Sequence, residues 1–137
     1  MSQGIADRVW LGDRAKRVEL VFMKLMEIAF FTDRVTQMTD FYRRFLGVDP
    51  VACSETMAIF FVNETKVFIH HRYDPKNGEL PPEDHHAFAV ENVDHACEQL
   101  VRQGLTLEIP PSDFYWGRSA YLRDPDGHQI EIMRLEK

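Results

Sequence analysis

Cysteine is scarce in this sequence of 137 residues, which limits both its chemistry and its compartment. The two cysteines, Cys53 and Cys97, have neither CxxC spacing nor the density of a disulfide framework. We therefore expect two buried thiols in a protein of a reducing compartment. Neither thiol has a base at a recognisable spacing, so nucleophilic catalysis by cysteine is disfavoured.

Long apolar runs and clusters of basic residues are also missing. No apolar stretch approaches the roughly 20 residues that a transmembrane helix needs, so no membrane association is expected. The first residues are polar and lack the layout of a secretory signal, which makes the cytoplasm the expected location. Acidic residues outnumber basic ones by 22 to 16, the net charge is −6, and no basic stripe stands out, so nucleic acid is not an expected partner.

The sequence does contain the alternating pattern of a small globular protein of the α+β class. Apolar residues recur at helical spacing in 35–46 and 93–103, and a glycine follows each segment. Residues 74–84 are rich in proline and glycine and are interpreted as a linker. Strands are expected at 25–32, 50–53, 57–62, 66–72, 85–90, 105–109, 119–123 and 128–134.

This order is βαβββ followed by βαβββ, which indicates an internal repeat. The two helices align with an offset of 58 residues, as Val35 with Val93, and the same offset places Glu27 of the first strand at the position of His85. One domain is expected, composed of an N-terminal extension at 1–22, a first module at 23–74, a linker at 75–83 and a second module at 84–137.

Alternation along the strands places three ionisable side chains on one face of the sheet. Glu27, His85 and Glu131 would face the concave side, while Ile130 and Ile132 would face the helices. A carboxylate between two isoleucines needs a partner, because an unpaired buried charge is costly. A metal ion is one such partner, and a salt bridge or a solvent-facing strand side is the alternative.

The C-terminal segment 123–132 is typical of a strand, a tight turn and a strand. Within Asp124-Pro125-Asp126-Gly127, Pro125 presets φ and Gly127 tolerates positive φ. Together with 31–47, 85–90 and 115–119, this segment resembles the vicinal oxygen chelate superfamily, which includes glyoxalase I, extradiol dioxygenases, fosfomycin-resistance thiol transferases and bleomycin-binding proteins. The resemblance covers about residues 24–136. It implies two βαβββ modules whose mixed sheets form one cup-shaped cavity, commonly around a divalent metal.

The resemblance also implies the metal ligands. They fall on Glu27, His85 and Glu131, although a slip of one residue in the first strand would replace Glu27 by Met26. One nitrogen and two carboxylates suit Mn²⁺, Fe²⁺, Ni²⁺, Co²⁺ or Zn²⁺. Such an ion would leave positions open for two adjacent substrate oxygens and would act as a Lewis acid. Glu131 would also be the catalytic base, as in glyoxalase I.

Some members take a fourth ligand from the last strand of the first module. There, Val67, Ile69 and His71 are expected to face inward and His70 to face away. Ile69 matches Glu131 by turn count and cannot bind a metal, which leaves His71 as the candidate fourth ligand or base.

Further residues are expected to contact a ligand or, alternatively, to pack at the rim of the cup. Arg118 or Tyr121 would meet an anionic or polar group. The complete set is Phe31, Ile69, Tyr115, Trp116, Arg118 and Tyr121.

Two functions remain open at this point. The first is a metal-dependent enzyme of the glyoxalase or dioxygenase type, acting as a lyase, dioxygenase or transferase on a small oxygenated substrate. The second is a metal-free protein that sequesters a drug-like or aromatic molecule in the same cup. The resemblance implies a homodimer in either case.

Overall fold

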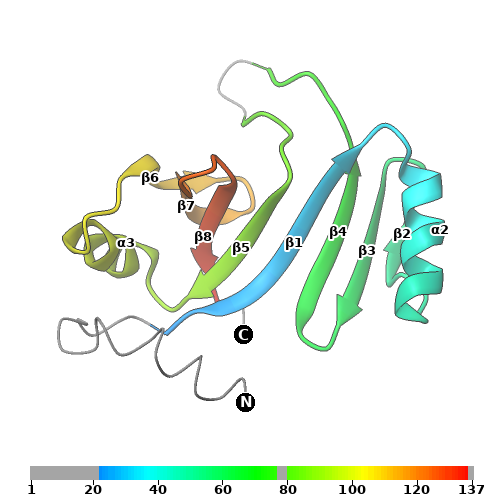
Figure 1. Cartoon of the computed structure of the whole chain (residues 1–137), viewed down its shortest axis with the longest axis horizontal. Helices are drawn as coiled ribbons and strands as arrows, with labels where there is room; N and C mark the ends of the chain where they lie inside the picture. Colours follow the sequence, from blue (N-terminus) through cyan, green and yellow to red (C-terminus); the bar gives the residue numbers. More distant parts are fainter. Residues whose placement is uncertain (1–21, 77–79, 136–137) are drawn as a thin grey trace, which may run out of the picture.

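The computed structural model describes residues 22–76 and 80–135, which form one mixed sheet and two helices (Figure 1). The order of the strands in the sheet is β2-β3-β4-β1-β5-β8-β7-β6. The elements are β1 (Lys24–Thr32), α2 (Val35–Leu46), β2 (Ala52–Cys53), β3 (Met57–Val62), β4 (Thr65–His71), β5 (His85–Val90), α3 (Val93–Arg102), β6 (Leu107–Phe114), β7 (Gly117–Arg123) and β8 (Gln129–Arg134). The predicted extension at 1–22 lies almost entirely outside the described residues.

The strand pairing confirms two βαβββ modules. In each module the first strand pairs in parallel with the last, as β1 with β4 and β5 with β8. The modules meet where β1 and β5 run antiparallel, with Glu27 opposite Ala87 and Ala29 opposite His85. These two pairs exchange under a shift of 58 residues, so the repeat found in the sequence is also the approximate symmetry of the sheet.

Each helix covers one module on the same face of the sheet. Val35 of α2 packs into a core cluster with Phe60 and Ile69, and Val93 of α3 packs into a second cluster with Ile132. In Figure 1, α2 lies beside the strands at one end of the sheet and α3 beside those at the other end. The opposite face of the sheet carries no helix in the described part of the chain, and we call it the cup face.

The helix ends follow local sequence signals. Gly47 ends α2 with a φ of 73°, the left-handed conformation that glycine adopts without steric cost, and its amide donates to the carbonyl of Arg43. Asn92 begins α3, where its side chain accepts a hydrogen bond from the amide of His95. Both helices therefore begin at their predicted residues and end within one residue of the prediction.

The face predicted for β4 is wrong. Val67 and Ile69 lie in the core beneath α2, while Phe68 pairs with Ala29 and faces the cup. His71 consequently shares the helix-side face with Ile69, and His70 faces the cup. The reason is hydrophobic burial. Val67 and Ile69 are apolar residues at alternate positions of β4 and pack in the core beneath a helix, as Ile130 and Ile132 of β8 do in the other module.

Two further predictions need correction. Strand β6 runs through Pro110 and Pro111, beyond the predicted end at residue 109. Proline is tolerated there because β6 is an edge strand. One of its sides has no neighbouring strand, so the missing backbone N–H of proline leaves no partner unsatisfied on that side. Cys53 is exposed rather than buried, because it lies on the short edge strand β2, whereas Cys97 is buried as expected.

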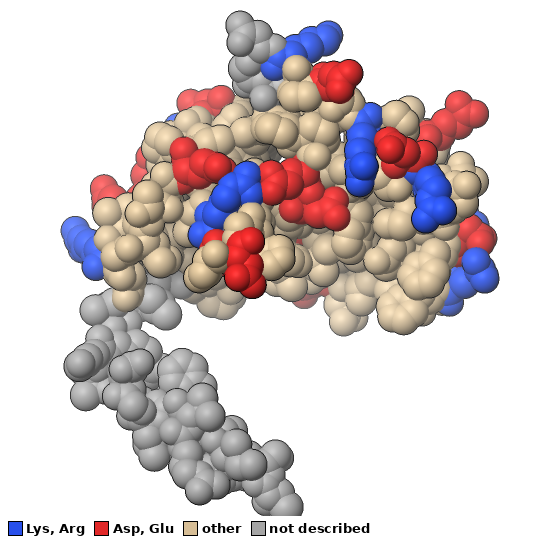
Figure 2. Space-filling model, turned by 45° about the horizontal axis from the view of Figure 1, so that its top comes forward, with Lys and Arg blue, Asp and Glu red and all other residues tan. Residues whose placement is uncertain are grey.

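Within residues 22–76 and 80–135, no helix is long and apolar enough to cross a membrane. Basic and acidic side chains are interspersed on the face drawn in Figure 2.

Candidate functional site

The centre of the cup face is a row of side chains from four adjacent strands. The registers align Glu27 of β1 with Ala87 of β5, Glu131 of β8 and Tyr121 of β7. His85 lies two residues along β5 on the same face. Ala87 between the two glutamates is fully buried and small, so it forms a floor over which longer side chains can converge. The predicted face of Glu27, His85 and Glu131 is thus confirmed, and Glu27 rather than Met26 takes that face.

Glu131 is a buried carboxylate surrounded by donors. Its side chain is only 6% exposed, and its Oε1 lies 3.2 Å from Nε2 of His85. Its Oε2 accepts hydrogen bonds from Oγ of Ser119 at 2.7 Å and from Nε1 of Trp116 at 3.2 Å. These contacts replace the water that the charge would lose on burial.

Electrostatics favour the charged forms of both members of this pair. Burial alone would raise the pKa of Glu131, but the hydrogen bonds from His85 and Ser119 outweigh it and lower that pKa below its ordinary value. Burial alone would lower the pKa of His85, but the Glu131 carboxylate and the Glu83 carbonyl outweigh it and raise that pKa. The contact therefore favours the imidazolium and the carboxylate over their neutral forms, compared with the same groups in water.

Tyr121 completes the polar group at the floor. Its burial, the negative charge of Glu131 and a hydrogen bond with that carboxylate all raise the pKa of the phenol. The phenol consequently stays protonated and donates its one O–H to the Glu131 carboxylate.

Glu27 influences the pair from the neighbouring strand. Its negative charge contributes to the raised pKa of both His85 and Tyr121. Across the described residues, no three His, Cys, Asp or Glu side chains are already arranged to hold a metal ion. The donor set of one imidazole and two carboxylates on one face, above the small Ala87, nevertheless fits the chemistry of a divalent cation.

The position of the first module that is equivalent to Glu131 does not supply a metal ligand. Phe68 pairs with Ala29 as Glu131 pairs with Ala87, so Phe68 occupies the position equivalent to Glu131. Ile69, predicted for that position and as a ligand contact, is fully buried in the core beneath α2 instead.

Aromatic rings line the cup beside the polar floor. The ring of Phe31 stacks on His85 with centroids 6.3 Å apart and contacts His70 at 5.8 Å. Phe114 stacks on Trp116 and meets Tyr121 edge to face. The sequence prediction included Phe31, Trp116 and Tyr121 but missed Phe114 and His70. The alternation Val67–Ile69 beneath a helix was the available signal for His70.

Two predicted rim residues have different surroundings. Arg118 lies on the face opposite to Ser119 and binds Asp94 of α3 at 2.7 Å and Asp113 at 2.9 Å, so its guanidinium is occupied on the helix side. Tyr115 is 97% exposed and touches only the ring of Trp116 among the described aromatic contacts.

Solved structures of the same fold include an epimerase from two bacteria. A hypothetical protein from Bacillus halodurans superposes with a TM-score of 0.65 at 15% identity, over 84% of this chain and 96% of its own. Methylmalonyl-CoA epimerase from Mycobacterium tuberculosis gives 0.63 at 17% identity, over 88% of this chain and 93% of its own. The Streptomyces coelicolor epimerase, as a variant in complex with 2-nitronate-propionyl-CoA, gives 0.60 at 19% identity, over 85% and 95%.

At these identities the structures establish a shared fold. No curated protein sequence matches significantly. The family model of the Glyoxalase/Bleomycin resistance protein/Dioxygenase superfamily matches residues 24–132, which run from β1 into β8 and include the floor residues Glu27, His85 and Glu131. The chain therefore belongs to the Glyoxalase/Bleomycin resistance protein/Dioxygenase superfamily.

Proposed function

We propose that the protein is a metal-dependent enzyme that acts on a small molecule with adjacent oxygens. The observation that supports this most is the buried contact between His85 and Glu131 at the floor of the cup, at 3.2 Å. Burying a histidine and a carboxylate together is costly unless they are paired, and such pairs are frequent at functional sites. Membership of the superfamily adds that the cup of related proteins receives small molecules.

The chemistry that suits this site is proton transfer next to a carbonyl group. Glu131 would accept a proton from carbon, and the electron pair would move to the carbonyl oxygen as an enolate. Tyr121 would transfer its hydrogen bond from Glu131, neutralised by that proton, to the enolate oxygen. Return of the proton to the same or the neighbouring carbon would give an epimer or an isomer. The aromatic rings beside the floor would exclude water from the carbanion equivalent.

A divalent cation would be held by His85 and Glu131, with Glu27 as the third ligand. Bound there, it would supply Lewis acidity to the adjacent oxygens. His85 would bind through Nε2, because its Nδ1 already donates to the carbonyl of Glu83 at 2.8 Å. Glu27 and Glu131 flank Ala87 on the neighbouring strands and belong to the same face, so Glu27 would be the nearest further carboxylate of that face to an ion held by His85 and Glu131.

A metal-free binding protein is the second candidate. It is favoured by Phe68 at the position equivalent to Glu131, and by the direct contact of His85 with Glu131, which already satisfies both groups. In this case the cup would hold a planar aromatic molecule between its rings, and Glu131 would be structural.

Metal analysis separates the two candidates. Protein purified without a metal-chelating column would be incubated with Mn²⁺, Ni²⁺, Zn²⁺ or Fe²⁺, dialysed and assayed for bound ion. The enzyme proposal expects one ion per chain, lost in His85→Ala and weakened in Glu131→Gln. His86→Ala is the matched control, since His86 neighbours His85 but pairs with Ile28 on the opposite face.

Equal loss of metal from both histidine variants would refute the site. Absence of any bound ion in the wild-type protein would favour the binding protein instead.

We further propose a homodimer in the cytoplasm. Exposed apolar side chains on α2 support the dimer. Phe41 and Phe45 stack on each other and remain 52% and 71% exposed, so a partner subunit could bury them. A monomeric mass by light scattering at micromolar concentration would contradict the dimer.

A further inference from the structure

The two residues immediately before His85, at the start of β5, are each held by a contact to a different strand. The carboxylate of Glu83 forms a two-bond pair with Arg123 of β7, at 2.6 and 2.8 Å. The next residue, Asp84, accepts a hydrogen bond from the backbone amide of Phe31 in β1 at 2.8 Å. Two consecutive residues are thus anchored to different modules.

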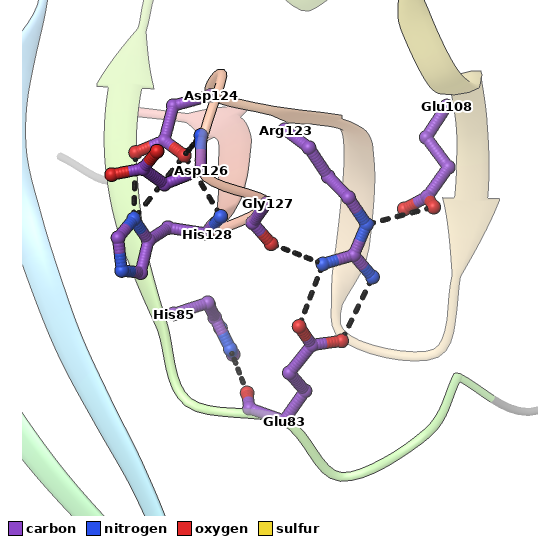
Figure 3. A network of polar contacts seen from close by, with 8 residues as sticks. All are labelled: Glu83, His85, Glu108, Arg123, Asp124, Asp126, Gly127 and His128. Atoms are coloured by element: carbon purple, nitrogen blue, oxygen red, sulfur yellow. Dashed lines mark hydrogen bonds and ion pairs between the residues drawn. The ribbon is translucent and has the colours of Figure 1, made fainter.

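Arg123 itself is held by further partners. Its Nε donates to Glu108 of β6 at 2.9 Å, and one terminal nitrogen also donates to the carbonyl of Gly127 at 2.8 Å. Figure 3 shows the guanidinium between Glu83, Glu108 and the turn that carries Gly127. A planar guanidinium with partners on three sides has one orientation, so it can hold Glu83 in one place.

The anchored residue controls His85 through its backbone. The carbonyl of Glu83 accepts a hydrogen bond from Nδ1 of His85 at 2.8 Å, as Figure 3 also shows. A carbonyl cannot donate, so Nδ1 must carry a proton. The other ring nitrogen, Nε2, faces the Glu131 carboxylate, which likewise can only accept, so Nε2 donates to it in the metal-free protein and would give up that proton to bind an ion.

We propose that Arg123 is a positioning residue that acts through Glu83 to fix the ring of His85, with Nδ1–H held on the Glu83 carbonyl and Nε2 directed at Glu131. The use of this orientation in catalysis rests on the proposed function, but the orientation itself does not. The carbonyl of Glu83 is the partner that fixes the ring, because it accepts the hydrogen bond from Nδ1. Partners of this kind change metal affinity by roughly 10-fold to 100-fold when they are removed.

The variants Arg123→Gln and Glu83→Gln remove the pairing from either side and leave every backbone carbonyl in place. Arg118→Gln is the matched control, because Arg118 lies on the same strand and also binds two carboxylates, Asp94 and Asp113, without any contact to Glu83. Glu108→Gln removes the other acidic partner of Arg123 and leaves its pairing with Glu83.

The direct measurement is the Nδ1–H proton signal of His85 and its exchange with water, in ¹⁵N-labelled protein without metal. The wild type, Arg118→Gln and Glu108→Gln are expected to show a slowly exchanging Nδ1–H. Arg123→Gln and Glu83→Gln are expected to exchange this proton faster, and Arg123→Lys, which can make one bond to Glu83, should lie between. If Arg123→Gln does not fold, Glu83→Gln carries the comparison.

Zn²⁺ titration is the second measurement. Affinity should fall about 10-fold in Arg123→Gln and stay near wild type in Arg118→Gln. An unchanged exchange rate of the His85 Nδ1–H in both pairing variants, or an equal change in Arg118→Gln, would overturn the inference. Lack of Zn²⁺ binding by the wild type would overturn the metal site alone, because the exchange is read in metal-free protein.

Discussion

Removing the imidazole of His85 should destabilise the metal-free protein strongly, because it leaves the carboxylate of Glu131 buried without its cationic partner. The side chains of His85 and Glu131 are 13% and 6% exposed, so solvent screens the pair only weakly. Loss of one partner from a buried ion pair costs about 3–5 kcal/mol. Ser119 and Trp116 still donate to Glu131, which places His85→Ala near the lower value, about 3 kcal/mol.

The assay is urea denaturation followed by circular dichroism, in buffer with a chelator. A loss of about 3 kcal/mol corresponds to roughly 12 °C in Tm for a domain of this size. Glu131→Gln and the double variant complete a cycle, with an expected coupling of about 1–3 kcal/mol between the two side chains. Additive losses, or a cost of His85→Ala below about 1 kcal/mol, would refute the charged pair.

The pH dependence follows from the two pKa shifts. The pKa of His85 is raised above 6.5, so its contribution is complete below pH 6.5 and is lost as pH rises through the folded-state value. The pKa of Glu131 is lowered below 4.5, so its contribution is complete above pH 4.5 and is lost as pH falls through the folded-state value. The cost of His85→Ala should therefore be largest between pH 4.5 and 6.5. A cost that grows steadily above that range would contradict the assignment.

Three other predictions concern the fold. Ile69→Ala should lower the free energy of unfolding by about 2–5 kcal/mol in urea denaturation, because Ile69 is fully buried beneath α2. Phe68→Ala should cost less stability and mainly change ligand binding. The reverse order would mean that Ile69, and not Phe68, faces the cup. Cys97 should react with iodoacetamide far more slowly than Cys53 in native protein, since burial raises the pKa of the Cys97 thiol; mass spectrometry of the labelled peptides reads the order. Gly47→Ala should lower stability by about 1 kcal/mol because its φ is 73°, and a Tm equal to wild type would contradict that conformation.

Periodicity was sufficient for much of this fold. The residues of α2 and the starts of α3 and β5 follow from apolar spacing and glycine stops, and the offset of 58 residues gave the shared face of Glu27 and His85. These features depend on local patterns that occur in both modules, so the assignment made in one module can be checked against the equivalent residues of the other.

The failures have a common physical origin in contacts between distant segments. Counting residues from the turn before β4 suggested that Ile69 faces the cup, but burial beneath α2 decided its face. The occupation of Arg118 by Asp94 depends on how α3 lies over β7, which no spacing in the sequence encodes. The donors Ser119 and Trp116 were also beyond pattern analysis, because their role depends on side-chain direction around Glu131.

The equivalence of Phe68 and Glu131 has a consequence for how such a protein can change over time. The two modules differ at this position: β8 of the second carries the carboxylate of Glu131, while the matching strand β4 of the first carries the ring of Phe68. Substitutions at Phe68 and its neighbours on the cup face can alter which molecule is accepted and leave His85 and Glu131 untouched. A duplicated fold thereby lets the inner surface of one half change while the buried polar group of the other half stays in place.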